Sequence, residues 1–136
     1  ADALTVATSS GDIKLDSVSS KDTRISANSG DVSLGDVVMD NIDLKTSSGN
    51  ITSGSIKAKR INGRASSGDV MIRDCDASEI NVVTTSGDVS IGIGSEMKYE
   101  YNTKTSSGDV NVPDSVEGAD GKCNIETSSG DIDVTQ

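Results

Sequence analysis

Bulky rings are nearly absent from this chain. Its 136 residues include no histidine, phenylalanine or tryptophan, only two tyrosines and one proline. The lack of histidine excludes any Ser-His-Asp or Cys-His catalytic centre within the chain. The shortage of aromatic rings removes the side chains that fill most globular cores. Only 32% of the residues are hydrophobic, against about 45–50% in an average globular domain, so the chain is poor in core-forming side chains.

Positive charge and long apolar runs are also scarce. The 22 acidic and 12 basic residues give a formal charge of −10, and no Lys/Arg cluster is present to displace phosphate counterions. We therefore expect neither a nucleic-acid partner nor an anionic membrane surface. No apolar run approaches the ~20 residues of a membrane span, and no signal peptide is visible. We expect one domain over residues 1–136, as a mature form or a segment of a longer protein.

What the sequence has in abundance is a repeat. Ser-Gly followed by Asp or Asn occurs seven times, with spacings of 19, 19, 19, 19, 21 and 22 residues. A Val or Ile stands two positions after every one of these glycines, and apolar or small residues alternate with polar ones on both sides. This alternation predicts two short strands per unit around a turn. A third, weaker apolar position follows seven residues after the glycine, at Val18, Val37, Ile56 and Cys75.

The repeat predicts an all-β fold, a single-domain parallel β-solenoid of about seven coils of 19 to 22 residues. One such unit has too few apolar side chains to bury a core alone, but stacked coils form a continuous narrow core. The crossover rule for parallel strands favours a right-handed path. An antiparallel sandwich of hairpins is the rival, because Ser-Gly-Asp is also acceptable hairpin chemistry. Hairpins would not require a fixed register across seven units.

The turn residues are the candidate structural ladder of the solenoid. We expect each corner to use a glycine that tolerates positive φ, and the next residue to accept a backbone N–H two residues on. The serines before the glycines (Ser10, Ser29, Ser48, Ser67, Ser86, Ser107 and Ser129) are expected to stack inward as a hydroxyl ladder. The ladder consists of Gly11, Gly30, Gly49, Gly68, Gly87, Gly108 and Gly130 with Asp12, Asp31, Asn50, Asp69, Asp88, Asp109 and Asp131.

The acidic column could instead share Ca²⁺ between coils. Each unit supplies a single carboxylate, whereas calcium-binding solenoid repeats supply several oxygens in a tight nonapeptide turn. Asn50 also occupies one position without breaking the repeat, which suits a hydrogen-bonding role. The sequence therefore favours a turn role, with no metal and no other cofactor.

The two cysteines both fall in inward positions. Cys75 and Cys123 are separated by about two and a half coils, or roughly 12 Å at the strand spacing of a sheet, which exceeds the ~7 Å Cα limit for a disulfide. We expect small buried thiols without a metal. The longer connections at residues 92–98 and 113–122 are where a ligand site could lie. Tyr101, beside the first of them, is expected to fill a widened core.

The tandem Thr/Ala-x-Ser-Gly-Asp-Val/Ile-x-Val/Ile units from Leu4 to Val134 resemble a bacterial adhesin-type β-strand-repeat family, a domain of unknown function. The resemblance implies a β-solenoid at the cell surface or in the cell envelope. It brings no catalytic residues.

Three function hypotheses follow. The first is a noncatalytic structural or adhesin-like module of the bacterial envelope that contacts a protein or glycan partner. The second is a self-assembling scaffold whose coils dock end to end, like the bactofilin polymers. The third is a polysaccharide-active β-helix enzyme, which would need a cleft with converging charged groups and aromatic platforms. An ice-binding array is disfavoured, because no outward Thr-x-Thr column persists.

Overall fold

The computed structural model describes residues 2–93, 99–112, 118–119 and 121–135, and these residues contain strands and turns but no helix. No described helix could therefore cross a membrane. The strands pair in parallel throughout. Their bounds are β1 (Ala3–Thr8), β2 (Ile13–Ala27), β3 (Val32–Thr46), β4 (Ile51–Ala65), β5 (Val70–Thr84), β6 (Val89–Ile93), β7 (Tyr99–Thr105), β8 (Val110–Asn111), β9 (Gly121–Thr127) and β10 (Ile132–Thr135).

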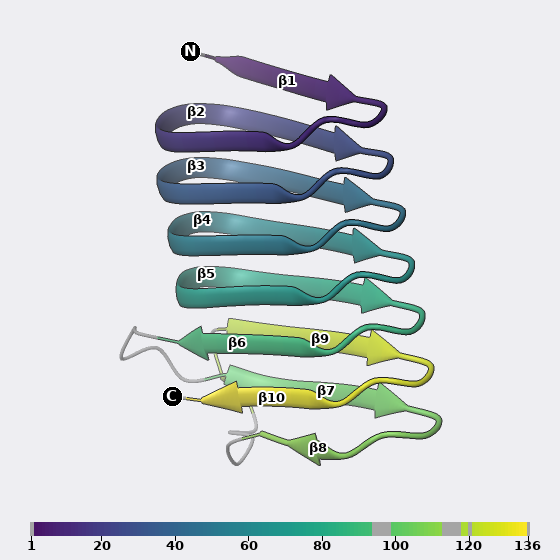
Figure 1. Ribbon diagram of the computed structural model, residues 1–136. Helices are drawn as coiled ribbons and strands as arrows, with labels where there is room; N and C mark the ends of the chain where they lie inside the picture. The colour runs from purple at the N-terminus through teal and green to yellow at the C-terminus, as the bar shows by residue number, and fades with distance from the viewer. Residues whose placement is uncertain (1, 94–98, 113–117, 120, 136) are drawn as a thin grey trace.

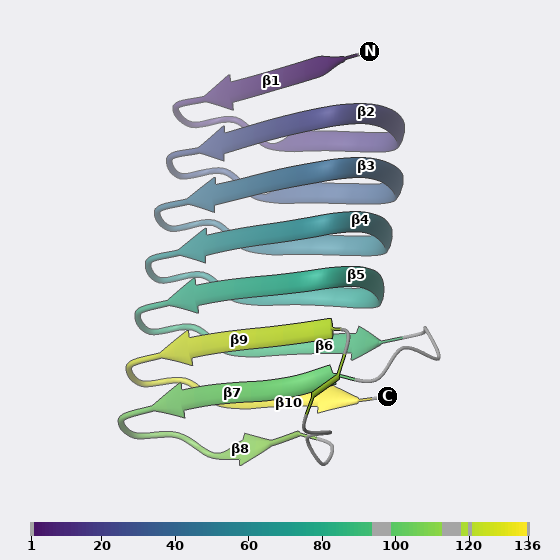
Figure 2. The ribbon, with the colours of Figure 1, turned by 180° about the vertical axis from the view of Figure 1, so that it is seen from behind.

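The predicted parallel β-solenoid is confirmed, with about six turns in place of seven. The difference arises at the two ends, where β1 and β8 each contribute only part of a coil. In Figure 1 the chain runs right to left in front, returns left to right behind and descends one layer per turn from β1 to β6, and Figure 2 gives the opposite view. This path is right-handed, as the crossover rule predicts.

The two short strands expected in each unit form one continuous strand in β2, β3, β4 and β5. Each of these has 15 residues and folds back halfway along its length. We call the halves that follow a glycine turn the front face, together with β6, β10 and β8. The halves that precede a glycine turn form the back face, together with β1, β9 and β7. The predicted third apolar position lies near the bend, where Val37, Ile56 and Cys75 are buried.

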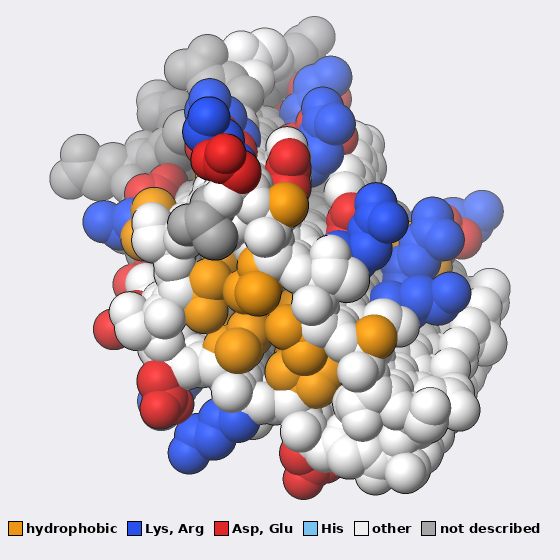
Figure 3. All heavy atoms as spheres, turned by 90° about the horizontal axis from the view of Figure 1, so that it is seen from above, with side chains coloured by type: hydrophobic (Ala, Val, Ile, Leu, Met, Phe, Trp, Pro, Cys, Tyr) orange, Lys and Arg blue, Asp and Glu red, His pale blue; other side chains and the backbone are white. Residues whose placement is uncertain are grey.

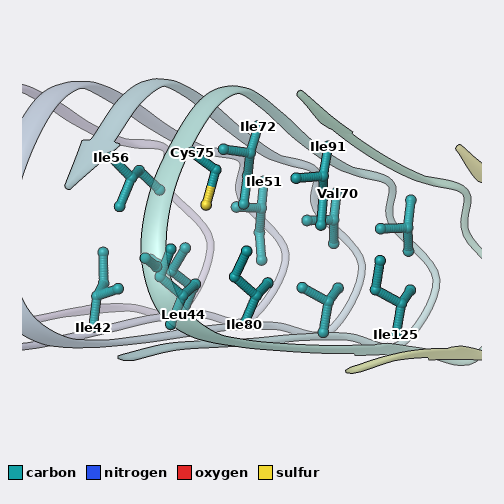
Figure 4. Close-up of a cluster of buried hydrophobic side chains, with 14 of the residues drawn as sticks. Ile42, Leu44, Ile51, Ile56, Val70, Ile72, Cys75, Ile80, Ile91 and Ile125 are labelled. Atoms are coloured by element: carbon teal, nitrogen blue, oxygen red, sulfur yellow. The ribbon is translucent and has the colours of Figure 1, made fainter. Parts of the chain in front are cut away.

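A narrow core separates the two faces. Ile51, Ile56 and Ile72 point from the front face toward Ile42 and Ile80 of the back face (Figure 4). All five are at most 2% exposed. Seen from the β1 end, hydrophobic side chains gather at the centre of the solenoid (Figure 3). β-Branched side chains suit this layer because they pack well between pleated strands.

The coils do not stack in sequence order at the C-terminal end. β9 pairs with β5 on one side and β7 on the other. On the front face, β10 likewise lies between β6 and β8. The last repeat is therefore inserted between the fifth and sixth repeats, which corrects the expectation that neighbouring units in sequence are always neighbours in space (Figures 1 and 2).

The composition of the strands explains this inserted order. In the observed stack Ile125 of β9 lies beside Val82 of β5, and Thr103 lies in the outermost back-face strand, β7. Sequence order would place Thr103 between two buried aliphatic side chains. A buried hydroxyl without a partner costs about 1–3 kcal/mol, so the observed order keeps Val82 beside Ile125 and leaves Thr103 half-buried at the end.

Tyr99 spans the inserted strand. It pairs with Gly121 of β9, and its hydroxyl donates to the carbonyl oxygen of Ala77 in β5. The Tyr99 oxygen also accepts the Ala77 N–H at 3.4 Å. Because glycine has no side chain, Gly121 leaves room for the buried ring to reach past β9. This contact joins β7 to β5 across the strand between them.

Candidate functional site

The turn glycines are required for close approach between coils. Among the described residues, positive φ occurs only at Gly118, so the expectation of positive φ at the corners is wrong. A Cβ built on Gly30, Gly49, Gly68, Gly87, Gly108 or Gly130 would lie 1.8–2.0 Å from the carbonyl oxygen of the glycine in the adjacent coil. Gly11, in the first coil, meets only the Thr8 hydroxyl oxygen at 3.3 Å. The repeat therefore preserves glycine because the backbones touch at this corner.

The acidic column forms a hydrogen-bonded ladder between coils. One carboxylate or amide oxygen of each member except Asp109 accepts the backbone N–H of the equivalent residue in the adjacent coil at 2.8–2.9 Å, and Asp109 ends the ladder as a donor. We expected each side chain to accept a backbone N–H within its own turn, but the N–H that it accepts comes from the adjacent coil. Asn50 fits this column because its amide oxygen accepts as Asp does. The ladder follows the inserted order, since Asp131 lies between Asp88 and Asp109.

The inward hydroxyl ladder is carried by threonine and not by the predicted serines. All seven serines before the glycines are exposed, and the hydroxyls of Ser29, Ser67 and Ser86 donate to backbone carbonyls one coil away. The threonines three residues before the glycines are buried or half-buried. Their hydroxyls donate to the glycine carbonyl of the adjacent coil at 3.1–3.4 Å, at Thr46, Thr84, Thr105 and Thr127. The prediction that the serine side chains point inward is wrong because the chain turns at the serine.

A second polar ladder runs along the outside of the back face. The Asn62 amide nitrogen donates to Asp43 at 3.0 Å, and Asn81 donates to Asn62 at 3.2 Å. Asn124 continues the series to Asn81 at 2.9 Å, and Asn102 donates to Asn124 at 3.1 Å. We call these five residues the amide ladder. The sequence showed the asparagines at one offset from the glycine, but not that they bond to one another.

Charges alternate in a neighbouring back-face column. Arg60 of β4 and Glu79 of β5 form an ion pair at 3.3 Å. Lys122 of β9 lies in register between Glu79 on one side and Glu100 of β7 on the other. Hydrogen bonding from Asn81, opposed by slight desolvation and assisted by Arg60, lowers the pKa of Glu79. Sequence order would instead place the two glutamates side by side, so this column also favours the insertion.

The cysteines are closer than the sequence suggested. β9 lies directly beside β5, with Cys123 opposite Ile80, so the separation of two and a half coils is wrong. Both thiols are free and 0% exposed. Burial, with smaller contributions from Cys123, Asp76 and Asp74, raises the pKa of the Cys75 thiol to about 12. Burial likewise raises the pKa of the Cys123 thiol to about 12. Both side chains therefore pack as neutral apolar groups.

The longer connections add little to the described site. Residues 94–98, 113–117 and 120, which include most of both predicted loop sites, lie outside the described residues. Tyr101 is buried in the outer strand β7, and burial raises the pKa of its hydroxyl to about 12. Within the described ranges, no group of three or more Cys, Asp and Glu side chains is arranged to hold a metal ion.

Comparison with known proteins places the whole chain in one family. The family model described as Toastrack DUF4097 matches residues 1–136. No curated protein and no solved structure gives a significant match. The predicted resemblance to a β-strand-repeat domain of unknown function therefore holds at the family level, whereas the adhesin designation has no support from these comparisons. The chain belongs to the Toastrack DUF4097 family.

Proposed function

We propose that this chain is a noncatalytic structural module of the bacterial cell envelope, which uses a solenoid face to contact a protein or glycan partner. One observation carries the proposal. The back face presents parallel columns of amide and charged side chains over six strands, from β2 through β5 and β9 to β7, on a scaffold whose coils are joined by backbone and turn hydrogen bonds. Such a surface suits repeated contacts along an extended partner.

The polar side chains that could act in catalysis make structural hydrogen bonds instead. The turn carboxylates accept backbone N–H groups, and Asp43 accepts from Asn62. Both tyrosines are buried, so they offer no platform for a sugar ring. These features support binding over turnover. A reducing-end assay with uronans and neutral glycans tests the point, and sustained product release that scales with protein concentration would contradict it.

A binding screen tests the contact role. The chain, labelled at an added C-terminal tag, is applied to immobilised bacterial glycans and to envelope proteins from a bacterium that carries this family. We expect saturable binding to one of these classes, competed by unlabelled chain. Binding to neither class, with a correctly folded chain by circular dichroism, would contradict the proposed role.

End-to-end self-assembly is the second candidate, and the β1 end favours it. Val6, Leu15 and Val18 are half-buried at this end. Among the described residues, no strand pairs with the outer edge of the front half of β2 (Figure 1). Unpaired strand edges favour pairing with another chain. Light scattering and small-angle scattering over a concentration series test this candidate. Particles that lengthen with concentration support it, and a constant monomer mass contradicts it.

A further inference from the structure

The outside of the back face contains a long shallow groove. One part, of about 460 Å³, runs over β2 to β5 and has Arg24, Lys45 and Arg64 among its lining residues. A second part, of about 630 Å³, runs over β5, β9 and β7. Both parts include Asn81 and Val83. The two parts therefore adjoin at β5 and follow one another along the solenoid axis, and together we call them the back-face groove.

The two walls of this groove differ in chemistry. The amide ladder forms one wall, and it continues past Asp43 to Arg24 in β2. The opposite wall lies two residues further along each strand, and long basic side chains predominate among its larger members. From β2 to β7 in spatial order, this wall consists of Ser26, Lys45, Arg64, Val83, Glu126 and Lys104.

The amide ladder retains hydrogen-bonding capacity on its outer side. A carboxamide has two N–H donors and an oxygen with two lone pairs. Asn62 and Asn124 each use one N–H and one oxygen contact along the ladder, which leaves a donor and an acceptor at each. Asn81 uses a second N–H for Glu79. Adjacent strands repeat every ~4.8 Å, so the free donors of Asn62 and Asn124, which lie two strands apart, are separated by about 9.6 Å along the groove.

The β2–β5 part of the groove is locally positive in an acidic protein. Three exposed cations, Arg24, Lys45 and Arg64, line it with one carboxylate, that of Asp43. The ion pair found in the described chain, Arg60 with Glu79, involves none of these three cations. An arginine beside an open groove can bind a carboxylate through two parallel hydrogen bonds. The charge therefore favours an anionic ligand.

The shape and charge of the groove favour a sugar chain over a peptide. Peptide partners usually bind through buried aromatic or aliphatic anchors in pockets. This groove is shallow, and the exposed apolar residue in its lining is Val83, at 43%. A row of amides beside cations matches the hydroxyl and carboxylate groups of an acidic polysaccharide. We propose that the back-face groove binds a linear, carboxylate-bearing glycan along the solenoid axis, which rests on the contact function proposed above.

Calorimetric titration tests this proposal with a hexameric oligouronide and a neutral cello-oligosaccharide of equal length. The variant Lys45→Glu/Arg64→Glu reverses two groove charges. The control Lys57→Glu/Lys59→Glu makes the same change in net charge on exposed residues of β4 outside both parts of the groove. Lys45→Gln/Arg64→Gln removes the charges with a smaller risk to folding. Circular dichroism establishes that each variant is folded.

We expect the oligouronide to bind at least tenfold more tightly than the neutral glycan, and its affinity to fall with added salt. The groove charge reversal should weaken binding at least tenfold, and the glutamine pair should weaken it less. The control pair should change affinity less than threefold.

Two results would overturn the proposal in different ways. Equal oligouronide affinity in wild type and the groove variants would move the site elsewhere but leave the contact function standing. No binding of the oligouronide would also overturn the proposed ligand, and the protein arm of the screen would then decide the contact function separately.

Discussion

Substitution of Gly68 by alanine is a direct test of why the turn glycines recur. In the wild-type structure a Cβ on Gly68 would lie 1.8 Å from the carbonyl oxygen of Gly49. Contacts under 3.0 Å essentially do not occur for real Cβ atoms, so the two coils would have to separate locally by about 1.2 Å. The obstacle is backbone and cannot rotate away.

The cost follows from the bonds at this corner. The Asp69 N–H lies 2.9 Å from the Asn50 oxygen, and the Ser67 N–H lies 3.0 Å from the Ser47 carbonyl. A separation of about 1.2 Å would lengthen both beyond hydrogen-bonding distance. Loss of two or three hydrogen bonds at this corner costs on the order of 3 kcal/mol. Reduced freedom of the unfolded chain would offset about 0.4–1 kcal/mol of this.

Gly54→Ala, in β4, is the matched control. A Cβ there would meet the Gly35 carbonyl oxygen at 3.4 Å, an ordinary contact. Urea unfolding followed by far-ultraviolet circular dichroism should show Gly68→Ala destabilised by about 2–3 kcal/mol and Gly54→Ala unchanged or slightly stabilised. A Gly68→Ala variant within about 0.5 kcal/mol of wild type, or equal losses in both variants, would refute the close-approach argument.

Three further substitutions or conditions test other parts of the structure. Tyr99→Phe keeps the ring but removes the bond to Ala77, and urea unfolding should show a loss of about 1–3 kcal/mol; an unchanged midpoint would contradict the role of this contact. Thr23 has a buried hydroxyl for which the described residues provide no partner, so Thr23→Val should raise the unfolding midpoint, and a loss of stability would reveal an unrecognised bond. The pKa values of Cys75 and Cys123 are raised from 9.0 to about 12, so the folded state keeps protons that the unfolded state releases. Stability should fall as pH rises from about 9 toward 12, and a thiol reagent at pH 8 should react with the two cysteines only after unfolding; rapid reaction in the native protein would contradict their burial.

The coil and its core were predictable because the repeat places every residue type in a column. Val32, Ile51 and Val70 lie at the same offset from their glycines, and all three are buried at 0–1% exposure. Only an inward β-strand position preserves such a column across units of constant length. The fold class and the handedness therefore followed from spacing and from a general rule of parallel connections.

The order of the last coils could not be read from the repeat, because each unit offers the same backbone pairing to any other unit. The choice depends on side chains that differ between units, such as Lys122 between Glu79 and Glu100. The two longer spacings of 21 and 22 residues were the available signal. They fall where the chain order and the spatial order diverge.

The candidate surface was only partly predictable. The asparagines at one offset from the glycine predicted a solvent-facing column, and Asn62, Asn81 and Asn102 do lie on the outer side of the back face. The hydrogen bonds between these asparagines depend on their side-chain rotamers. The groove depends on the size of the side chains two residues further along each strand. Neither property is encoded in spacing alone.

Nuclear Overhauser effects between back-face strands test the inserted position of the last repeat. With selectively labelled protein, the inserted order predicts backbone contacts between Val82 and Ile125 and between Ile125 and Thr103. It predicts none between Val82 and Thr103, because β9 separates β5 from β7. Direct contacts between Val82 and Thr103 would establish stacking in sequence order and exclude the inserted order.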